Sequence, residues 1–331
     1  LAIYKTVLVW MNVPTEAMKD AQEYTFVSIL GVFFIFGYNA ICAVLRGMGD
    51  SKRPMLIIGI ASVCNIVLDL LFVGPLKMGA MGAALATVIA QGVSCVIAAV
   101  YLYHRRESFG FDFKLQSFKP NTEKLKAILK IGIPTAIQGM AYCAISMVLT
   151  RMISGYGAEA VATQRVGGQI ESISWNTADG FAAALNAFIA QNYGAGKNDR
   201  VKKGYKASLW TVGIWGLLVS AVFICIPEPI ARIFFHEPKA IATSVEYLII
   251  IGFSEAFMCV ELTTVGALSG LGRTRLCSII SIAFTSARIP LSIILGGIMG
   301  LDGIWWAISS TSIVKGIIFT CTFLWITRKR R

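Results

Sequence analysis

Hydrophobic residues occur in nine long runs separated by short polar gaps, and each run is long enough to cross a lipid bilayer as a helix. About 20 apolar residues cover the roughly 30 Å hydrocarbon core of a bilayer. The runs predict helical spans at about residues 21–46, 53–76, 79–103, 128–153, 158–190, 205–227, 241–268, 276–298 and 302–327. Residues 1–11 (LAIYKTVLVWM) look like the end of one further span. The expected fold class is therefore an all-α membrane protein, a polytopic helical bundle.

Composition and charge agree with this interpretation. Of 331 residues, 56% are hydrophobic and only 15% are charged, whereas about 25% of residues are charged in soluble domains. The formal net charge of +12 comes from basic residues that gather in alternate gaps between the runs. Basic gaps face the cytoplasm in multi-pass proteins, so the excess charge indicates topology and not nucleic-acid binding. The basic residues at 328–331 predict a cytoplasmic C-terminus in the cell membrane.

The sequence also contains an internal repeat. LRGMGDSK at 45–52 aligns with LSGLGRTR at 268–275, which lies 223 positions later, and MGAMG at 78–82 aligns with MGLDG at 299–303. The repeated unit holds six spans, so both copies should cross the membrane in the same direction. We expect two parallel six-helix repeats, with about 100 residues of the first repeat lying upstream of this sequence, so that about nine full spans and a stub remain.

The repeat predicts a division into three parts. Residues 1–103 form the C-terminal part of the first lobe, namely the end of its third helix and helices four to six. Residues 104–127 are a basic cytoplasmic linker, and residues 128–331 are the second lobe with helices seven to twelve.

A lone carboxylate stands in a span that is otherwise uncharged. In CNIVLDLLF at 64–72, Asn65 and Asp69 share one helix face with Ser62. A carboxylate and amide oxygens can coordinate Na+, and the carboxylate alone can take a proton. Asn39, in the preceding span, is a further oxygen donor. The alternative is that these side chains only form hydrogen bonds with neighbouring helices.

The second half carries a polar and aromatic stripe. Gln164, Gly168, Glu171 and Trp175 follow the spacing of one helix face. Such a face suits a cavity for flat cationic molecules, which it would bind through cation–π and carboxylate contacts. Equally, it can be a polar face that only packs against other helices.

Further charged and polar residues lie inside other spans of the second half. Glu255 and Glu261 are candidates for the same substrate cavity, and so is Gln138. We expect Arg288 and Lys315 to pair with intramembrane acids in a structural role, because unpaired charges inside a bilayer are costly.

These stretches together resemble the multidrug and toxic compound extrusion (MATE) family. The resemblance covers essentially the whole chain in family order. It rests on LRGMGDSKRPM (45–55), the N-x-x-x-D of CNIVLDLLF (64–72), the G-A-x-G-A-A-x-A pattern from Gly79, IGIPTAIQ (131–138), AQNYGAGKNDRVKKG (190–204), GALSGLGRT (266–274) and ARIP (287–290).

The resemblance implies a two-lobed, V-shaped fold that exports amphipathic and often cationic compounds in exchange for Na+ or H+. It implies a cation-coupling site at Asn65 and Asp69, with no cofactor besides the coupling ion. The family's acidic residue in the first helix has no counterpart in this sequence, and the segment from Gln138 to Cys143 lacks the glutamate that some members carry in the seventh helix. We expect a monomer in the lipid bilayer.

Two other functions are consistent with a polytopic bundle. A lipid-linked oligosaccharide flippase has a similar fold but needs a strongly cationic cavity. An intramembrane enzyme needs a nucleophile and base or metal ligands at mid-depth, and the only two histidines, His104 and His236, lie outside the expected spans. We therefore expect an antiporter and not an enzyme.

Overall fold

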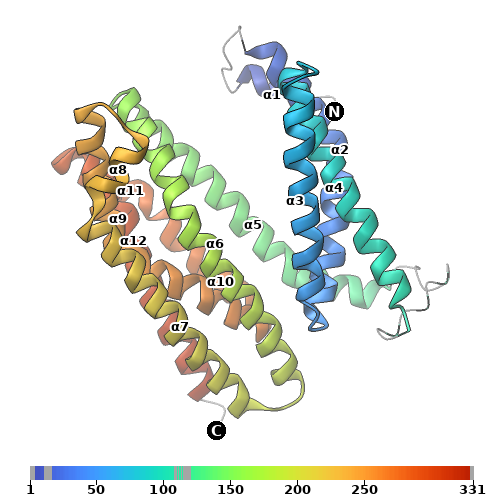
Figure 1. The fold of residues 1–331 in the computed structure, drawn as a ribbon. Coiled ribbons are helices and arrows are strands. Elements are labelled where there is room, and N and C mark those ends of the chain that lie inside the picture. Colours follow the sequence, from blue (N-terminus) through green and yellow to red (C-terminus); the bar gives the residue numbers. More distant parts are fainter. Residues whose placement is uncertain are drawn as a thin grey trace. The chain divides into compact units, whose positions relative to one another are not determined.

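A computed structural model describes residues 4–10, 17–107, 110, 112, 114 and 121–328, and the regular elements within them are α-helices (Figure 1). The helices are α1 (Tyr4–Trp10), α2 (Met18–Gly47), α3 (Lys52–Val73), α4 (Gly79–His104), α5 (Thr122–Ser154), α6 (Ala158–Gly194), α7 (Asn198–Cys225), α8 (Pro227–Phe234), α9 (Pro238–Gly270), α10 (Thr274–Ser286), α11 (Arg288–Met299) and α12 (Leu301–Arg328). The helical fold class predicted from the hydrophobic runs is confirmed.

Eight segments of the described chain are long and apolar enough to span a bilayer: α2, α3, α4, α5, α7, α9, α10 with α11, and α12. The remaining predicted span, residues 158–190, coincides with α6, which has 37 residues but is more polar than the other eight segments. The reason is that α6 packs against α9 and α7. Its buried positions include Thr163, Gly167 and Ser174, which face protein, so this helix needs less apolar surface than one that faces lipid.

The predicted linker is shorter than expected at its C-terminal end. Helix α5 begins at Thr122, six residues before the predicted span, because the side-chain oxygen of Asn121 accepts the backbone N–H groups of Glu123 and Lys124 at 3.0 and 3.1 Å. An Asn at this position satisfies donors that a helix start otherwise leaves free. Residues 108, 109, 111, 113 and 115–120 of the linker lie outside the described residues.

The chain divides into two compact units, Leu1–Pro120 and Asn121–Arg331. In the first unit, α4 packs against both α2 and α3. A small apolar cluster joins these helices, formed by Tyr38, Cys42, Ile57 and Ala98. Asp50, in the turn between α2 and α3, accepts a hydrogen bond from the hydroxyl of Tyr101 on α4 at 2.7 Å, which fixes the turn to the end of α4.

In the second unit, α9 packs against α6, α7 and α12 and contributes many of the unit's buried residues. Two glycines allow its close approach to α6. A Cβ atom on Gly266 would lie 2.4 Å from the carbonyl oxygen of Ala182, and one on Gly270 would lie 2.6 Å from that of Asn186. Small residues are the usual means by which membrane helices pack closely.

The internal repeat recurs in the backbone as matching turns. Two of the aligned glycine pairs have positive φ angles: Gly49 (91°) with Gly272 (73°), and Gly79 (55°) with Gly300 (66°). The residue after Gly49 donates its N–H to the carbonyl of Leu45, and the residue after Gly272 donates to that of Leu268, both at 2.9 Å. This is the Schellman end of a helix, which places glycine in the left-handed region.

Replacing Gly272 with alanine should lower the free energy of unfolding by about 1–2 kcal/mol, because a Cβ atom disfavours the left-handed conformation. The control is Gly213→Ala, at a helical position of α7 where nothing lies within 4 Å of an added Cβ. This variant should be unchanged or slightly more stable, because alanine favours a helix more than glycine does. Thermal unfolding of the purified protein in detergent measures both, and equal midpoints in the two variants would contradict the assignment.

Candidate functional site

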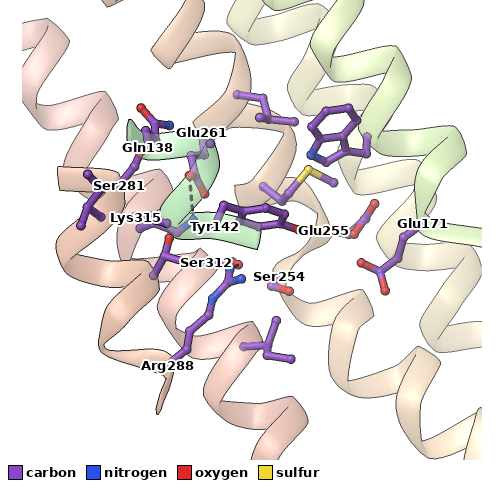
Figure 2. A pocket seen from close by; sticks show the side chains of 18 of the residues that line it. Gln138, Tyr142, Glu171, Ser254, Glu255, Glu261, Ser281, Arg288, Ser312 and Lys315 are labelled. Carbon is purple, nitrogen blue, oxygen red and sulfur yellow. Dashed lines mark hydrogen bonds and ion pairs between the residues drawn. The ribbon is translucent and has the colours of Figure 1, made fainter. Parts of the chain in front are cut away.

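The second unit encloses a cavity of 370 Å³ between α5, α6, α9, α10–α11 and α12. Figure 2 shows its lining, which is rich in polar and charged side chains. These include Gln138, Tyr142, Glu171, Trp175, Ser254, Glu255, Glu261, Ser281, Arg288, Ser312 and Lys315. The structure therefore brings together five of the six residues that the sequence proposed for a substrate cavity, and it adds the two basic residues that were expected to be structural.

The sixth residue, Gln164, lines a neighbouring cavity of 460 Å³. Glu171 and Trp175 belong to both cavities, so the predicted stripe on α6 does follow cavity surface over its whole length. Gln164 accepts a hydrogen bond from the indole Nε1 of Trp305 at 2.9 Å. The ring of Trp305 in turn meets the ring of Tyr247 edge-on at 5.1 Å. Aromatic packing thus fixes one end of the stripe.

The acids of the cavity have different surroundings. Glu171 accepts a hydrogen bond from the hydroxyl of Tyr247. Glu255 is only 1% exposed, and its Oε1 has no hydrogen-bond partner among the described residues. A buried carboxylate oxygen without a partner is costly, which is typical of a group that serves a ligand or a proton. Trp175, in contrast, leaves 45% of its surface exposed.

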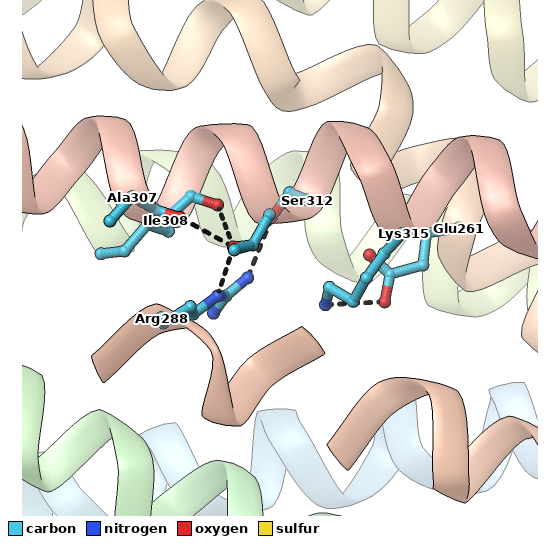
Figure 3. A network of polar contacts seen from close by, with 7 residues as sticks. Glu261, Arg288, Ala307, Ile308, Ser312 and Lys315 are labelled. Carbon is cyan, nitrogen blue, oxygen red and sulfur yellow. Dashed lines mark hydrogen bonds and ion pairs between the residues drawn. The ribbon is translucent and has the colours of Figure 1, made fainter. Parts of the chain in front are cut away.

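Lys315 and Glu261 form an ion pair inside the bundle. Nζ of Lys315 lies 2.8 Å from Oε1 of Glu261, and the two side chains are 7% and 9% exposed. The pair links α12 to α9, as Figure 3 shows. Each charge depends on the other, because an unpaired charge at this depth would be strongly destabilising. Glu261 thus lines the cavity as a neutralised acid.

Arg288 differs from the expectation that it pairs with an acid. In the described part of the chain it forms no ion pair, and its Nε and Nη2 donate instead to the hydroxyl oxygens of Thr311 and Ser312 at 3.0 and 2.9 Å (Figure 3). Thr311 donates its own proton to backbone carbonyls of α12. The hydroxyls hold the guanidinium in place but do not neutralise it. Sequence reasoning did not single out Thr311 or Ser312, since such residues are common in every span.

The residues proposed for cation coupling lie on α2 and α3 in the first unit. The side chains of Asn65 and Asp69 are half-buried, and Nδ2 of Asn65 and Oδ1 of Asp69 are buried atoms without a partner among the described residues. Asn39 is exposed and donates to the carbonyl of Ile35 in its own helix at 2.8 Å. The described residues contain no cluster of three or more His, Cys, Asp or Glu side chains that could hold a metal.

Comparisons with known proteins agree with this architecture. The model of the MatE family matches residues 1–71 and 134–294. A probable multidrug resistance protein NorM from Thermotoga maritima is 30% identical over 95% of this chain and 68% of its own length. A probable multidrug resistance protein YpnP from Bacillus subtilis is 30% identical over 89% of this chain and 65% of its own length. The chain spans about two thirds of these relatives.

A solved structure described as the outward-facing conformation of a multidrug resistance MATE family transporter of the MOP superfamily is also similar. It has 26% sequence identity and a TM-score of 0.89, and the match covers 98% of this chain and 72% of that one. The polar cavity therefore lies in a bundle of known transporter fold. The chain belongs to the MatE family of multidrug efflux transporters, and it is a multi-pass membrane protein and not an enzyme.

Proposed function

We propose that this transporter exports amphipathic cations by alternating access, in exchange for Na+ or H+. The observation that carries the proposal is the cavity of the second unit, where Glu255 is buried with an unpartnered oxygen and Trp175 offers an exposed ring. Three acids and two basic side chains line this cavity, so its net charge is −1 when all are ionised. A cationic cargo would be attracted by that charge.

We propose a different role for each of the residues that would contact cargo. The volume of 370 Å³ is within the range of sites that hold drug-sized molecules. The ring of Trp175 would lie against the flat body of a cation, and the free oxygen of Glu255 would receive its charged group. Glu171 keeps its contact with Tyr247, which orients this carboxylate towards the same space. Gln138, which accepts from the hydroxyl of Ser278 at 3.2 Å, provides a polar contact at the α5 wall.

Coupling to the ion gradient is proposed at Asp69, with Asn65 beside it on α3. The unpartnered Oδ1 of Asp69 fits a group that binds either a proton or a small hard cation. Charging and discharging of this carboxylate would bias the protein between its two access states. The amide nitrogen of Asn39 donates within its own helix, and its side-chain oxygen would be the further ligand to a cation. The monomeric state and the cytoplasmic C-terminus belong to the same proposal.

A flippase for lipid-linked oligosaccharides is the alternative that the sequence left open. Such cargo carries pyrophosphate, which needs several cations at the site, whereas the interior of the spans α2 to α4 offers Asp69 and no basic residue. Ethidium efflux from cells that express the protein, measured with and without a Na+ gradient, distinguishes the two. Gradient-dependent efflux supports the antiporter, and its absence under both Na+ and H+ gradients would contradict it.

Replacing Trp175 with alanine should weaken ethidium binding about 3- to 30-fold, because the loss of a cation–π contact in a partly dry site is of this size. Fluorescence anisotropy of ethidium titrated with the purified protein measures the change. The matched control is Trp210→Ala, on α7, whose ring is 66% exposed and lines neither cavity. Equal loss in both variants would show that Trp175 has no special contact with cargo.

A further inference from the structure

A further cavity lies at one end of the helix bundle of the second unit, apart from the site described above. Its volume is 860 Å³, and it is bounded by the first third of α5, the turn that joins α9 to α10, and the end of α12. It shares no lining residue with the two cavities of the candidate functional site. These boundaries are ends of membrane-spanning segments, so the cavity lies where hydrocarbon meets the lipid headgroups.

Three basic side chains converge on this cavity from different elements. They are Lys130 on α5, Arg273 in the turn, and Arg275 in the first turn of α10. Among the described residues, no acid lines this cavity or forms an ion pair with any of the three cations. The lining therefore carries three positive charges that no described acid compensates, and such a concentration of one charge attracts an anion.

The internal repeat indicates that this charge is particular to the second unit. Arg273 aligns with Asp50 of the first unit, at the offset of 223 positions. Asp50 accepts hydrogen bonds from the backbone N–H of Arg53 and from the hydroxyl of Tyr101. In the second unit an arginine replaces this acid, while the turn keeps the same backbone geometry. The turn can therefore form without a positive charge at this position, so the arginine is not explained by the fold alone.

Apolar side chains border the same cavity. Trp325 and Ile279 are 63% and 57% exposed, and Leu276 and Ile326 are partly exposed beside them. Tryptophan is enriched at the membrane interface, where its ring lies at the level of the headgroups. A soluble anion would satisfy the cations but would leave the apolar border uncovered. A phospholipid satisfies both, because its phosphate and its acyl chains are joined in one molecule.

We propose that this cavity binds the headgroup of an acidic phospholipid, whose phosphate oxygens contact Lys130, Arg273 and Arg275. The planar fork of an arginine accommodates two phosphate oxygens, and the lysine adds a point charge. The acyl chains lie against Ile279 and Trp325. A zwitterionic lipid has the same phosphate beside an ammonium group, which the three cations repel. The bound lipid joins α5, the turn between α9 and α10, and α12 at one end of the unit, and it does not depend on the identity of the cargo.

A pair of matched lipids tests this site. The probes are phosphatidylglycerol, with one net negative charge, and phosphatidylcholine, with no net charge, each with the same chains and the same fluorophore on one chain. Anisotropy titrations with the purified protein in detergent should show at least about fivefold tighter binding of phosphatidylglycerol, since each basic residue near an anionic headgroup contributes about that factor. The triple variant Lys130→Gln, Arg273→Gln and Arg275→Gln should weaken phosphatidylglycerol about tenfold or more and leave phosphatidylcholine within about twofold.

A second triple variant controls for the total charge of the protein. Arg200→Gln, Lys203→Gln and Lys206→Gln remove three charges from exposed positions of α7 that line none of the three cavities. This variant should keep the preference for phosphatidylglycerol. If the triple variant of the cavity folds poorly, the single change Arg275→Gln, at an exposed position, should still weaken phosphatidylglycerol about fivefold.

Inorganic phosphate distinguishes a lipid site from a site for a soluble anion. Added in large excess over the lipid, it should leave most of the phosphatidylglycerol bound, because it cannot cover the apolar border. Complete displacement would show that the cavity takes a free anion and would overturn the assignment to a lipid. Equal affinity of the wild-type protein for the two lipids, or an equal loss of phosphatidylglycerol binding in both triple variants, would overturn it as well. Export of cargo is measured separately, so these results leave the proposed function unaffected.

Discussion

Replacing Lys315 with methionine should lower the free energy of unfolding by about 3–5 kcal/mol, the largest stability effect that we expect from a single side chain. The change removes one partner of the buried pair and leaves the carboxylate of Glu261, which is 7% exposed as a residue, without its cation. Methionine is similar in length to lysine and fills the same space. The loss of stability would therefore come from the missing charge and not from a cavity left by a smaller side chain. Thermal unfolding of the purified protein in detergent provides the measurement.

Two controls make this result specific. The double variant Lys315→Met with Glu261→Leu removes both charges and should recover most of the stability, because a buried pair can often be replaced by apolar residues. Lys239→Met breaks the pair of Lys239 with Glu159, whose side chains are 80% and 39% exposed, and should change stability by less than about 1 kcal/mol. If Lys315→Met and Lys239→Met have the same effect, the pair inside the bundle is not an essential contact.

Replacing Asp69 with asparagine should reduce gradient-driven ethidium efflux about tenfold or more, which is a typical size for the loss of coupling between two sites. Asparagine keeps the shape of the side chain but can neither take a proton nor supply a carboxylate to Na+. Because Asp69 lies in a different unit from the cavity, the affinity for ethidium under equilibrium conditions should stay within about twofold. Efflux from cells and anisotropy with purified protein measure the two quantities.

The control for this variant is Asp199→Asn, at an exposed position in the first turn of α7. It removes the same charge and should leave efflux unchanged. Efflux by Asp69→Asn at the wild-type rate, with its dependence on the gradient preserved, would show that the coupling ion binds elsewhere. Loss of equilibrium ethidium binding in this variant would instead indicate that Asp69 contacts cargo.

Hydrophobic runs were sufficient to predict where the spans lie, because bilayer thickness sets the length of each helix independently of its neighbours. The repeat in the sequence extends to the backbone, because the aligned residues Gly49 and Gly272 adopt the same turn. The residues at which helices begin and end could not be predicted as closely from the hydrophobic runs. The start of α5 depends on one side chain, Asn121, which caps a turn that hydropathy alone does not detect.

Contacts between spans could not be predicted in the same way. Several intramembrane acids were available to Lys315, and only the packing of α12 on α9 selects Glu261. For Arg288 the partners are hydroxyl groups, Thr311 and Ser312, which the sequence repeats in many spans. The periodicity of α6 did place Gln164, Glu171 and Trp175 on one cavity-facing stripe, because a single helix fixes that relation by itself.

The binding of cationic cargo in the cavity is tested most directly by the affinity of purified protein for ethidium before and after the change Glu255→Gln, measured by the same anisotropy titration. We expect the variant to bind ethidium about tenfold more weakly or worse, because the unpartnered oxygen of Glu255 supplies the charge that receives the cation. Unchanged affinity in a variant that unfolds at the wild-type temperature would contradict the claim that this cavity binds cationic cargo.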